Sequence, residues 1–472
     1  MSFTIDGEYN SATVHGPRDM FDDSCLEQIE TMVNEPAFIG DDDISIMPDG
    51  HKGSGAVIGF TMPLKERVCP NTVGVDVGCG MYAVNFGQPD IDIEDDDVLS
   101  ELDSNIRDHV PTGFDVHDET DYHIVNDFPW GKCKRKLKAI DQNIGISLPD
   151  ADVYDEYFKD MCDRVGHDVV RAINSIGTLG GGNHFIELGT DSNGDLWTVI
   201  HSGSRGPGAA IAQYWQDKAT EHTFERLSTV EIPESEVQYF DGDAIRKQAD
   251  GTFVASPGEL SIDRESILAD YEGEAIDGKF GQLKSFMNAG KSDSSPFDYL
   301  AGDEAAGYIV DMIFAQTYAS VSRQLMASSV QESIESMVKQ SPLVYDSIES
   351  VHNYIDFEDA TIRKGACRAY EDERLIVPFN MSFGTIIASG RGKPDWNKSS
   401  AHGAGRAMGR TEATNRFDDD QFDEETSDVF MSERPLDEIP SAYKDARRVE
   451  SALADSVDVV DRIEPVLTVK AP

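Results

Sequence analysis

Basic residues are scarce in this chain. It carries 40 Lys and Arg against 88 Asp and Glu, which gives a formal net charge of −48. The acidic excess is spread along the chain, and such a surface repels nucleic acid at low salt. At molar salt the screening length is only about 3 Å, so an acidic surface of this kind is tolerated there. We therefore read the charge as an adaptation to salt that indicates a halophilic host and says little about activity.

Cysteines are also few, and long apolar runs are missing. The six cysteines lack the paired spacings of zinc ribbons. No stretch has the length of a membrane span, and the N-terminus has neither the basic start nor the apolar run of a secretory leader. We therefore expect a cytoplasmic protein with reduced thiols. No internal repeat is visible, and a hydrophobic content of 39% suits a folded core.

Helical and strand patterns are interleaved without regular alternation. Strands are expected at 44–47, 56–61, 81–86 and 465–469, with further short strands in 343–390. Helices are expected after a capping box at Ser24 to Glu27 and over 97–109, 151–176 and 303–337. The fold class predicted is α+β, a single large mixed domain (1–472) with complex central β-sheets flanked by helices. Within it, residues 227–295 are expected to form a surface insertion, and the acidic stretch 418–425 a solvated loop.

One glycine-rich stretch, Gly74 to Gly80, places a carboxylate and a thiol three residues apart at Asp76 and Cys79. Glycines allow backbone angles that a side chain would forbid, so the two groups can converge on one point. A thiolate needs a nearby cation to stay deprotonated. The stretch therefore predicts a metal site that other ligands complete; the alternative is a glycine turn around a buried thiol.

Three histidines occupy strand ends or glycine loops of similar composition: His184, His201 and His352. Taken singly, each is equally well explained as a hydrogen-bonded structural histidine. Together with the thiol and the carboxylate they form a donor set typical of a metal site. Five ligands exceed what one tetrahedral ion needs, and two ions bridged by the thiolate would use them all. These donors also suit zinc, so the residues alone leave the metal open.

His402 lies in the sequence His-Gly-Ala-Gly-Arg, where we expect a helix to open. Free amides at a helix N-terminus attract phosphate, so this histidine is a candidate nucleophile toward a nucleotide. The alternatives are a sixth metal ligand and a helix-capping histidine. Nearby, residues 361–410 hold nine basic and four acidic residues. This local excess predicts polyanion binding; the alternative is ion pairing with the acidic remainder of the chain.

These motifs, in this order, resemble the RtcB family of GTP-dependent RNA ligases. The resemblance covers most of the chain and rests on PDGHKGSG, GVDVGCGM, GGGNHFIE, HSGSRGPG, SVHN, IRKGACRA, HGAGRAMGR and the terminal Lys470. It implies an enzyme that joins RNA 3′-phosphate or 2′,3′-cyclic phosphate ends to 5′-hydroxyl ends. Its substrates would be tRNA halves or broken RNA ends, in tRNA splicing or RNA repair. An archease-like activator is a candidate partner, no membrane is involved, and a monomer is expected.

The resemblance also implies roles for single residues. Cys79 would bridge two Mn²⁺ ions, one completed by Asp76 and His184, the other by His201 and His352. His402 would attack the α-phosphate of GTP and carry GMP, which then passes to the RNA 3′-phosphate before the 5′-hydroxyl displaces it. The residues that match the family's guanine-nucleotide pocket are Asn183, His184, Phe185, Ile186, Glu187, His352, Asn353, Pro378, Phe379, Asn380, Met381, Thr385, His402, Gly403, Ala404, Gly405 and Lys470.

Three stretches depart from the best-known archaeal pattern of the family. No histidine precedes Arg363, residues 379–383 replace a glycine-serine loop, and Asp395-Trp396-Asn397 precedes the nucleophile loop. These departures resemble a shorter bacterial and phage-like branch, for which RNA repair is an alternative role to splicing. Other functions that fit the residues are a metal-dependent phosphoesterase, an enzyme that guanylylates 3′-phosphates without sealing, and a non-catalytic RNA-binding or metal-storage protein. A covalent GMP adduct would argue against the phosphoesterase.

Overall fold

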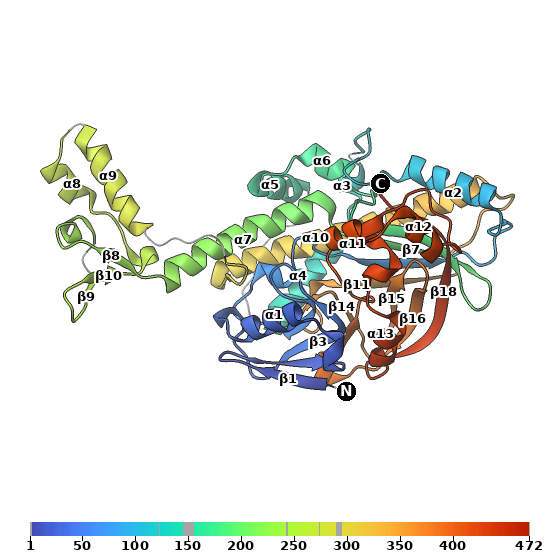
Figure 1. Cartoon of the computed structure of the whole chain (residues 1–472). Coiled ribbons are helices and arrows are strands. Elements are labelled where there is room, and N and C mark those ends of the chain that lie inside the picture. The colour runs from blue at the N-terminus through green and yellow to red at the C-terminus, as the bar shows by residue number, and fades with distance from the viewer. Residues whose placement is uncertain are drawn as a thin grey trace.

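The computed structural model describes residues 2–121, 123–144, 155–241, 244–272, 274–288 and 295–471. Two mixed β-sheets and the helices around them form the main body (Figure 1). The first sheet has the order β1-β2-β3-β4-β13-β12. Its strands are β1 (Ser2–Asp6), β2 (Ser11–His15), β3 (Ile44–His51), β4 (Ile58–Pro63), β13 (Thr361–Lys364) and β12 (Asn353–Asp356). The predicted α+β class with several sheets is confirmed.

The second sheet has seven strands in the order β11-β5-β7-β6-β18-β16-β15, and all its neighbours are antiparallel. Its strands are β11 (Asp346–Val351), β5 (Gly80–Asn85), β7 (Leu196–Ser202), β6 (Phe185–Thr190), β18 (Val457–Val469), β16 (Gly384–Gly390) and β15 (Arg374–Asn380). Every residue of β7 is buried, as expected of a strand covered on both faces. The predicted terminal strand at 465–469 is only the end of the longer β18. A small two-stranded pair, β14 (Ala366–Arg368) with β17 (Ser399–Ala401), lies beside them.

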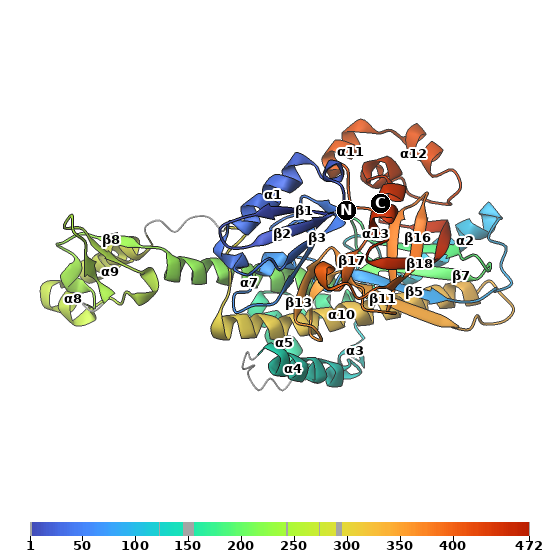
Figure 2. The same ribbon diagram turned by 90° about the horizontal axis from the view of Figure 1, so that it is seen from below.

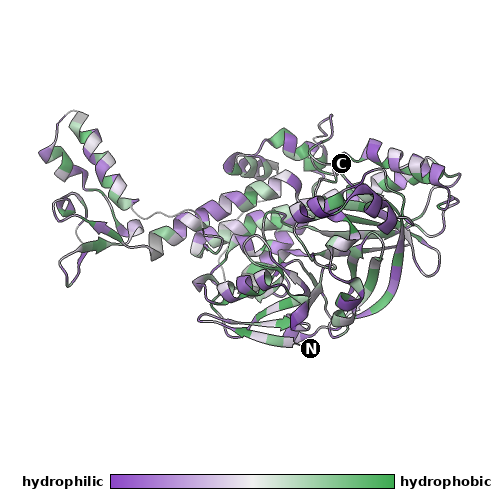
Figure 3. Ribbon diagram, viewed as in Figure 1, coloured by the Kyte–Doolittle hydropathy of each residue, from purple (hydrophilic) through white to green (hydrophobic). Residues whose placement is uncertain are grey.

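Helices pack around the two sheets. They are α1 (Asp23–Val33), α2 (Asp96–His109), α3 (His123–Asn126), α4 (Trp130–Ile144), α5 (Asp155–Val165), α6 (Val169–Asn174), α7 (Arg205–Leu227), α10 (Gly302–Glu335), α11 (Arg410–Arg416), α12 (Asp419–Glu425) and α13 (Ala446–Leu453). In Figure 3 the outer helices carry both hydrophilic and hydrophobic residues, as amphipathic covering helices do. Among the described residues, none of the helices combines the length and apolarity that a membrane crossing requires.

The long helix α10 matches the prediction over 303–337 closely. It runs along the sheets, with α4 and α5 on its outer side (Figure 2). Its Arg323 is completely buried and donates to the backbone oxygens of Gly78 and Ser202, at 2.7 and 2.8 Å, while pairing with Glu349 at 2.8 Å. The helix therefore holds the end of the glycine turn against the end of β7.

Three local predictions were wrong. Helix α1 is capped by Asp22, whose side chain accepts from the Cys25 amide, and not by Ser24. The helix expected over 151–176 is divided into α5 and α6 at Gly166, which has a φ of +70°; the first residues of that prediction, 151–154, lie outside the described residues. The acidic stretch 418–425 forms α12 because Phe422 is buried beneath it.

A separate group of elements lies at the far end of α7, away from the main body (Figure 1). It contains β8 (Val230–Ile232), β9 (Arg246–Lys247), β10 (Phe253–Ala255), α8 (Arg264–Asp270) and α9 (Glu274–Met287). Its three strands form their own sheet over a hydrophobic cluster that includes Tyr239, Ile267 and Leu283. The weak periodicity of 227–295 did not indicate this regular structure, and its role as an insertion stays a prediction.

Candidate metal centre and nucleotide pocket

The glycine turn fits tightly between a loop and a helix. Its Gly78 donates to the backbone oxygen of Asn353 at 2.7 Å and has a φ of +71°. A Cβ at this position would lie 2.9 Å from the α-carbon of Gln316 on α10. Only glycine satisfies both the positive φ and the close approach. This positions Cys79 immediately before β5.

The predicted ligands meet because four strand ends meet. Cys79 precedes β5 and His184 precedes β6, while His201 lies near the end of β7 and His352 follows β11. In the register of the sheet, His201 lies between Met81 on one side and Phe185 on the other. Val351 pairs with Gly80 at the same edge. Residues from four separate parts of the chain therefore converge on one point.

The side-chain atoms are close enough to share metal ions. Sγ of Cys79 lies 3.1 Å from Nε2 of His201 and 3.5 Å from Nε2 of His184. Nε2 of His201 lies 3.3 Å from Nε2 of His352, and Nε2 of His184 lies 2.9 Å from Oδ2 of Asp76. The thiol and the three imidazoles are buried. The structure thus brings together all five residues that the sequence analysis proposed as ligands.

Hydrogen bonds orient two of the imidazoles toward the thiol. Nδ1 of His184 lies 2.9 Å from the Leu179 carbonyl, and Nδ1 of His201 lies 3.0 Å from the Asn183 carbonyl. Because a carbonyl oxygen only accepts, Nδ1 carries the proton and the Nε2 lone pair faces inward. This is the usual second contact of a metal-bound histidine.

The electrostatics of the cluster also fit divalent ions. Burial lowers the pKa of His201 and of His352, so both rings are neutral and able to ligate. Burial and the neighbouring Asp76 raise the pKa of the Cys79 thiol, which therefore needs a cation to become a thiolate. A cation would also separate the two inward lone pairs that face each other across 3.3 Å. Cys79, His184 and His201 form the group whose donor atoms all lie within 4.8 Å of one another.

His402 lies beside this cluster but does not open a helix. It follows β17, and the next helix, α11, begins at Arg410; the expected phosphate site at a helix N-terminus is therefore wrong. The β14–β17 pair places His402, and its ring centroid lies 4.7 Å from that of His352. Gly405 has a φ of +72°, and a Cβ there would lie 2.1 Å from the backbone oxygen of Asp49, so the loop requires glycine.

Asp49 is the partner of His402, and the sequence analysis did not single it out. It lies on β3 and is completely buried. Its Oδ2 lies 2.6 Å from Nδ1 of His402. A carboxylate in this position keeps the proton on Nδ1 and leaves the Nε2 lone pair of His402 available. The only available signal was its place in the PDGHKGSG motif.

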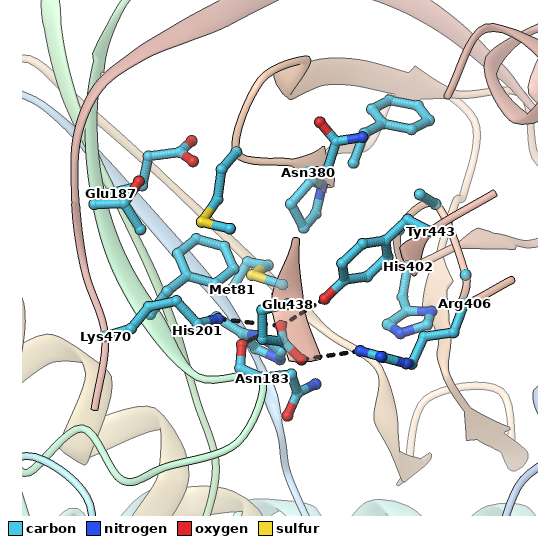
Figure 4. Close-up of a pocket in the computed structure, with 18 of the residues that line it drawn as sticks. Met81, Asn183, Glu187, His201, Asn380, His402, Arg406, Glu438, Tyr443 and Lys470 are labelled. Atoms are coloured by element: carbon cyan, nitrogen blue, oxygen red, sulfur yellow. Dashed lines mark hydrogen bonds and ion pairs between the residues drawn. The ribbon is translucent and has the colours of Figure 1, made fainter. Parts of the chain in front are cut away.

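A pocket of about 790 Å³ opens next to His402 (Figure 4). Most of the predicted nucleotide residues line it: Asn183, Phe185, Glu187, Pro378, Phe379, Asn380, Met381, His402, Gly403, Ala404, Gly405 and Lys470. The other predicted residues lie behind its wall. Ile186 packs in the core, Thr385 donates to Glu187 at 3.1 Å, and the Asn353 side chain donates to the backbone oxygen of Asp76 at 3.3 Å. The metal candidates His184 and His352 are likewise not in the pocket wall.

One wall of the pocket is a charged cluster that the sequence analysis missed. Its centre is Glu438, which is buried and accepts from Lys470 at 3.1 Å, Arg406 at 3.0 Å and Tyr443 at 2.5 Å. Burial alone would raise the pKa of Glu438, but Lys470 and Arg410 outweigh burial and hold the pKa below its ordinary value. Glu438 lies outside every glycine motif, so no local signal marked it.

Most cations of the basic segment 361–410 are already paired. Arg363 and Arg368 bind Asp356, and the remaining arginine pairs are Arg374 with Asp346, Arg391 with Asp458, Arg406 with Glu438, and Arg410 with Asp437 and Glu438. Lys364 donates to the backbone oxygen of Asn71 at 2.8 Å. The prediction that this excess charge marks a polyanion surface is wrong for these residues, and the alternative of ion pairing is correct.

Comparison with known proteins places the chain in a family. A family model described as tRNA-splicing ligase RtcB matches residues 28–249 and 295–471. The chain belongs to the RtcB family. Among similar RtcB proteins, the RNA-splicing ligase RtcB of Escherichia coli (strain K12) is 29% identical over 443 residues, which cover 90% of each chain. The tRNA-splicing ligase RtcB of Nanoarchaeum equitans is 24% identical over 499 residues, which cover 90% of this chain and 87% of the relative. The RtcB match leaves out residues 250–294.

Proposed function

We propose that this protein is an RNA ligase that joins 3′-phosphate or 2′,3′-cyclic phosphate ends to 5′-hydroxyl ends. GTP would supply a guanylyl group to His402, and two Mn²⁺ ions would serve the reaction. Membership of the RtcB family supports the ligase class, and the donor cluster supports metal use. The substrates would be tRNA halves or broken RNA ends in the cytoplasm, with a monomeric enzyme and an archease-like protein as a candidate activator.

The observation that carries the proposal is the contact between His402 and Asp49. It leaves the Nε2 lone pair of His402 as a nucleophile while Nδ1 donates to a buried carboxylate 2.6 Å away. The ring of His402 lies against that of His352, so a phosphate attacked by Nε2 would reach the metal donors at once. This arrangement serves covalent transfer of a nucleotidyl group better than it serves a sixth metal ligand.

The donor set would divide between two ions. Asp76 and His184 would hold one, His201 and His352 the other, and Cys79 would bridge them. When bound, such ions offset the charge that develops on phosphoryl oxygens. The chain's own contribution is to keep the imidazoles neutral and their inner nitrogens exposed to the site, through burial and the carbonyls that accept from Nδ1.

The chemistry of the pocket favours guanine. Guanine offers N–H donors beside a carbonyl oxygen on one edge. Glu187 and Lys470 lie at one end of the pocket, where a carboxylate would accept and an ammonium would donate (Figure 4). The two side chains are close enough for Lys470 to lower the pKa of Glu187 against the larger effect of burial. The rings of Phe185 and Tyr443 supply flat apolar surface for the base.

The test is incubation with radiolabelled GTP and Mn²⁺ at molar KCl, followed by a denaturing gel. Wild type should carry the label and His402→Ala should not, although the variant keeps its fold and its metal content. An adduct in His402→Ala would refute the nucleophile. No adduct in wild type across several metals would favour the metal-dependent phosphoesterase. Adding RNA with 3′-phosphate and 5′-hydroxyl ends separates sealing from guanylylation of the 3′-phosphate alone.

A further inference from the structure

Phe114 lies in the loop between α2 and α3, and 92% of its side chain is exposed. Among the large hydrophobic residues in the described ranges, it is the most exposed. A phenylalanine held in water gains nothing from packing, so its position needs another explanation. The loop lies close to the C-terminus of the chain (Figure 1), where the methyl group of Ala471 approaches Gly113.

The backbone around Phe114 is firmly held. Gly113 donates to the Gly180 carbonyl at 2.8 Å and accepts from the Arg205 guanidinium at 2.9 Å. The carbonyl of Phe114 accepts from Arg171 at 2.8 Å. The aromatic ring is therefore presented to solvent from a fixed position, which is the property required of a binding platform.

The position of this loop relates Phe114 to the metal centre. Four histidine rings follow one another, with centroid distances of 4.7 Å from His402 to His352, 5.1 Å from His352 to His201, and 5.3 Å from His201 to His184. His184 is next to the glycine loop, because a Cβ on Gly180 would lie 2.8 Å from its Nδ1.

Since Gly113 is bonded to Gly180, Phe114 lies beyond the His184 end of the row, opposite His402. It does not line the nucleotide pocket. The guanylyl group and Phe114 would therefore lie at opposite ends of the metal centre.

We propose that Phe114 is a stacking platform for the terminal base of an RNA end that enters the metal centre. The inference rests on the proposed function in taking RNA as the substrate. With guanosine in its pocket at the His402 end, the bases of the RNA ends must lie outside that pocket, and the His184 end is free for them. Aromatic side chains bind unpaired bases of any sequence through their faces.

The charge of the protein supports a stacking contact over a phosphate contact. The net charge is −48, and Phe114 is followed directly by Asp115. The arginines of 361–410 are paired with carboxylates. Salt weakens phosphate contacts steeply but does not screen the stacking of rings. A stacked base would therefore keep the RNA end in place at high salt.

The test measures binding directly, without turnover. RNA oligonucleotides carry 2-aminopurine as the last base, next to either a 3′-phosphate or a 5′-hydroxyl, and its fluorescence is quenched when it stacks. Wild type and Phe114→Trp should quench one of the two probes, which identifies the end that binds. Phe114→Ala should abolish the quenching and weaken binding about 5- to 150-fold, the value of one base–aromatic stack. The loss should be similar at low and at molar KCl.

The matched control is Tyr345→Ala, which removes another exposed aromatic ring at the opposite end of β11 and β5. An oligonucleotide with an abasic terminal nucleotide should bind wild type and Phe114→Ala equally. Equal quenching in wild type and Phe114→Ala would overturn the proposal, as would quenching of neither probe by wild type. A variant that changes only the association state of the protein would indicate a protein contact instead. Guanylylation of His402 should stay normal in Phe114→Ala, so failure of the ligase proposal shows separately as an unlabelled wild type.

Discussion

Glu187 allows a quantitative test of the pocket. The residue lies on β6 and is 3% exposed, with Oε1 accepting from the Thr385 hydroxyl at 3.1 Å. Burial raises the pKa of its carboxyl from 4.5 to about 8, although Thr385 and Lys470 act in the opposite direction. The empty pocket therefore holds a protonated carboxyl at neutral pH. Glu187→Gln keeps the shape and an acceptor for Thr385 but removes the ionisation.

The sign follows from the direction of this pKa change. The folded state binds the proton more tightly than the unfolded state does, so the stabilising contribution is complete below pH 4.5 and is lost as the pH rises to about 8. The difference of about 3.5 in pKa corresponds to at most about 5 kcal/mol, because each pKa unit is worth about 1.36 kcal/mol. Relative to wild type, Glu187→Gln should gain stability over this range of pH.

The assay is urea denaturation of wild type and Glu187→Gln between pH 5 and pH 8.5 at one salt concentration. The difference in free energy of unfolding should be small at pH 5 and should grow steadily toward pH 8 in favour of the glutamine. As a control, Thr385→Val removes a hydrogen bond that lowers the Glu187 pKa, so the change should move to higher pH. A difference that does not depend on pH would refute the assignment of a buried neutral carboxyl.

Three further substitutions test the site and its support. Asp49→Asn offers an N–H to Nδ1 of His402 and so favours the wrong tautomer; labelling of His402 by GTP should slow on the order of 10⁴-fold, and an unchanged rate would remove Asp49 from the mechanism. Cys79→Ala should lose bound Mn²⁺ by elemental analysis and also lose the adduct, whereas a normal metal content would contradict the bridging role. Arg363→Met leaves two buried aspartates without their partner and should cost about 3–5 kcal/mol in denaturation experiments. Arg391→Met, at an exposed pair, is its control and should change the midpoint little.

The sequence by itself determined which residues could do chemistry. A thiol, a carboxylate and histidines within glycine-rich stretches are unusual locally, and this local chemistry identified Cys79 and His402 before any fold was known. The glycines carry information of the same kind, because a positive φ such as that of Gly78 is a property of one residue. The long helix α10 could also be predicted, since its apolar residues follow one another without interruption.

The tertiary structure decided the partners. Asp49 lies 353 positions before His402, and Glu438 lies 32 positions before Lys470, so no local pattern connects them. The basic excess of 361–410 was misread for the same reason, because the carboxylates that neutralise it come from other segments, as Asp458 does for Arg391. Charge and hydrogen-bonding capacity are properties of a residue, but whether they are already satisfied depends on which distant groups the packing of the sheets brings within 3 Å.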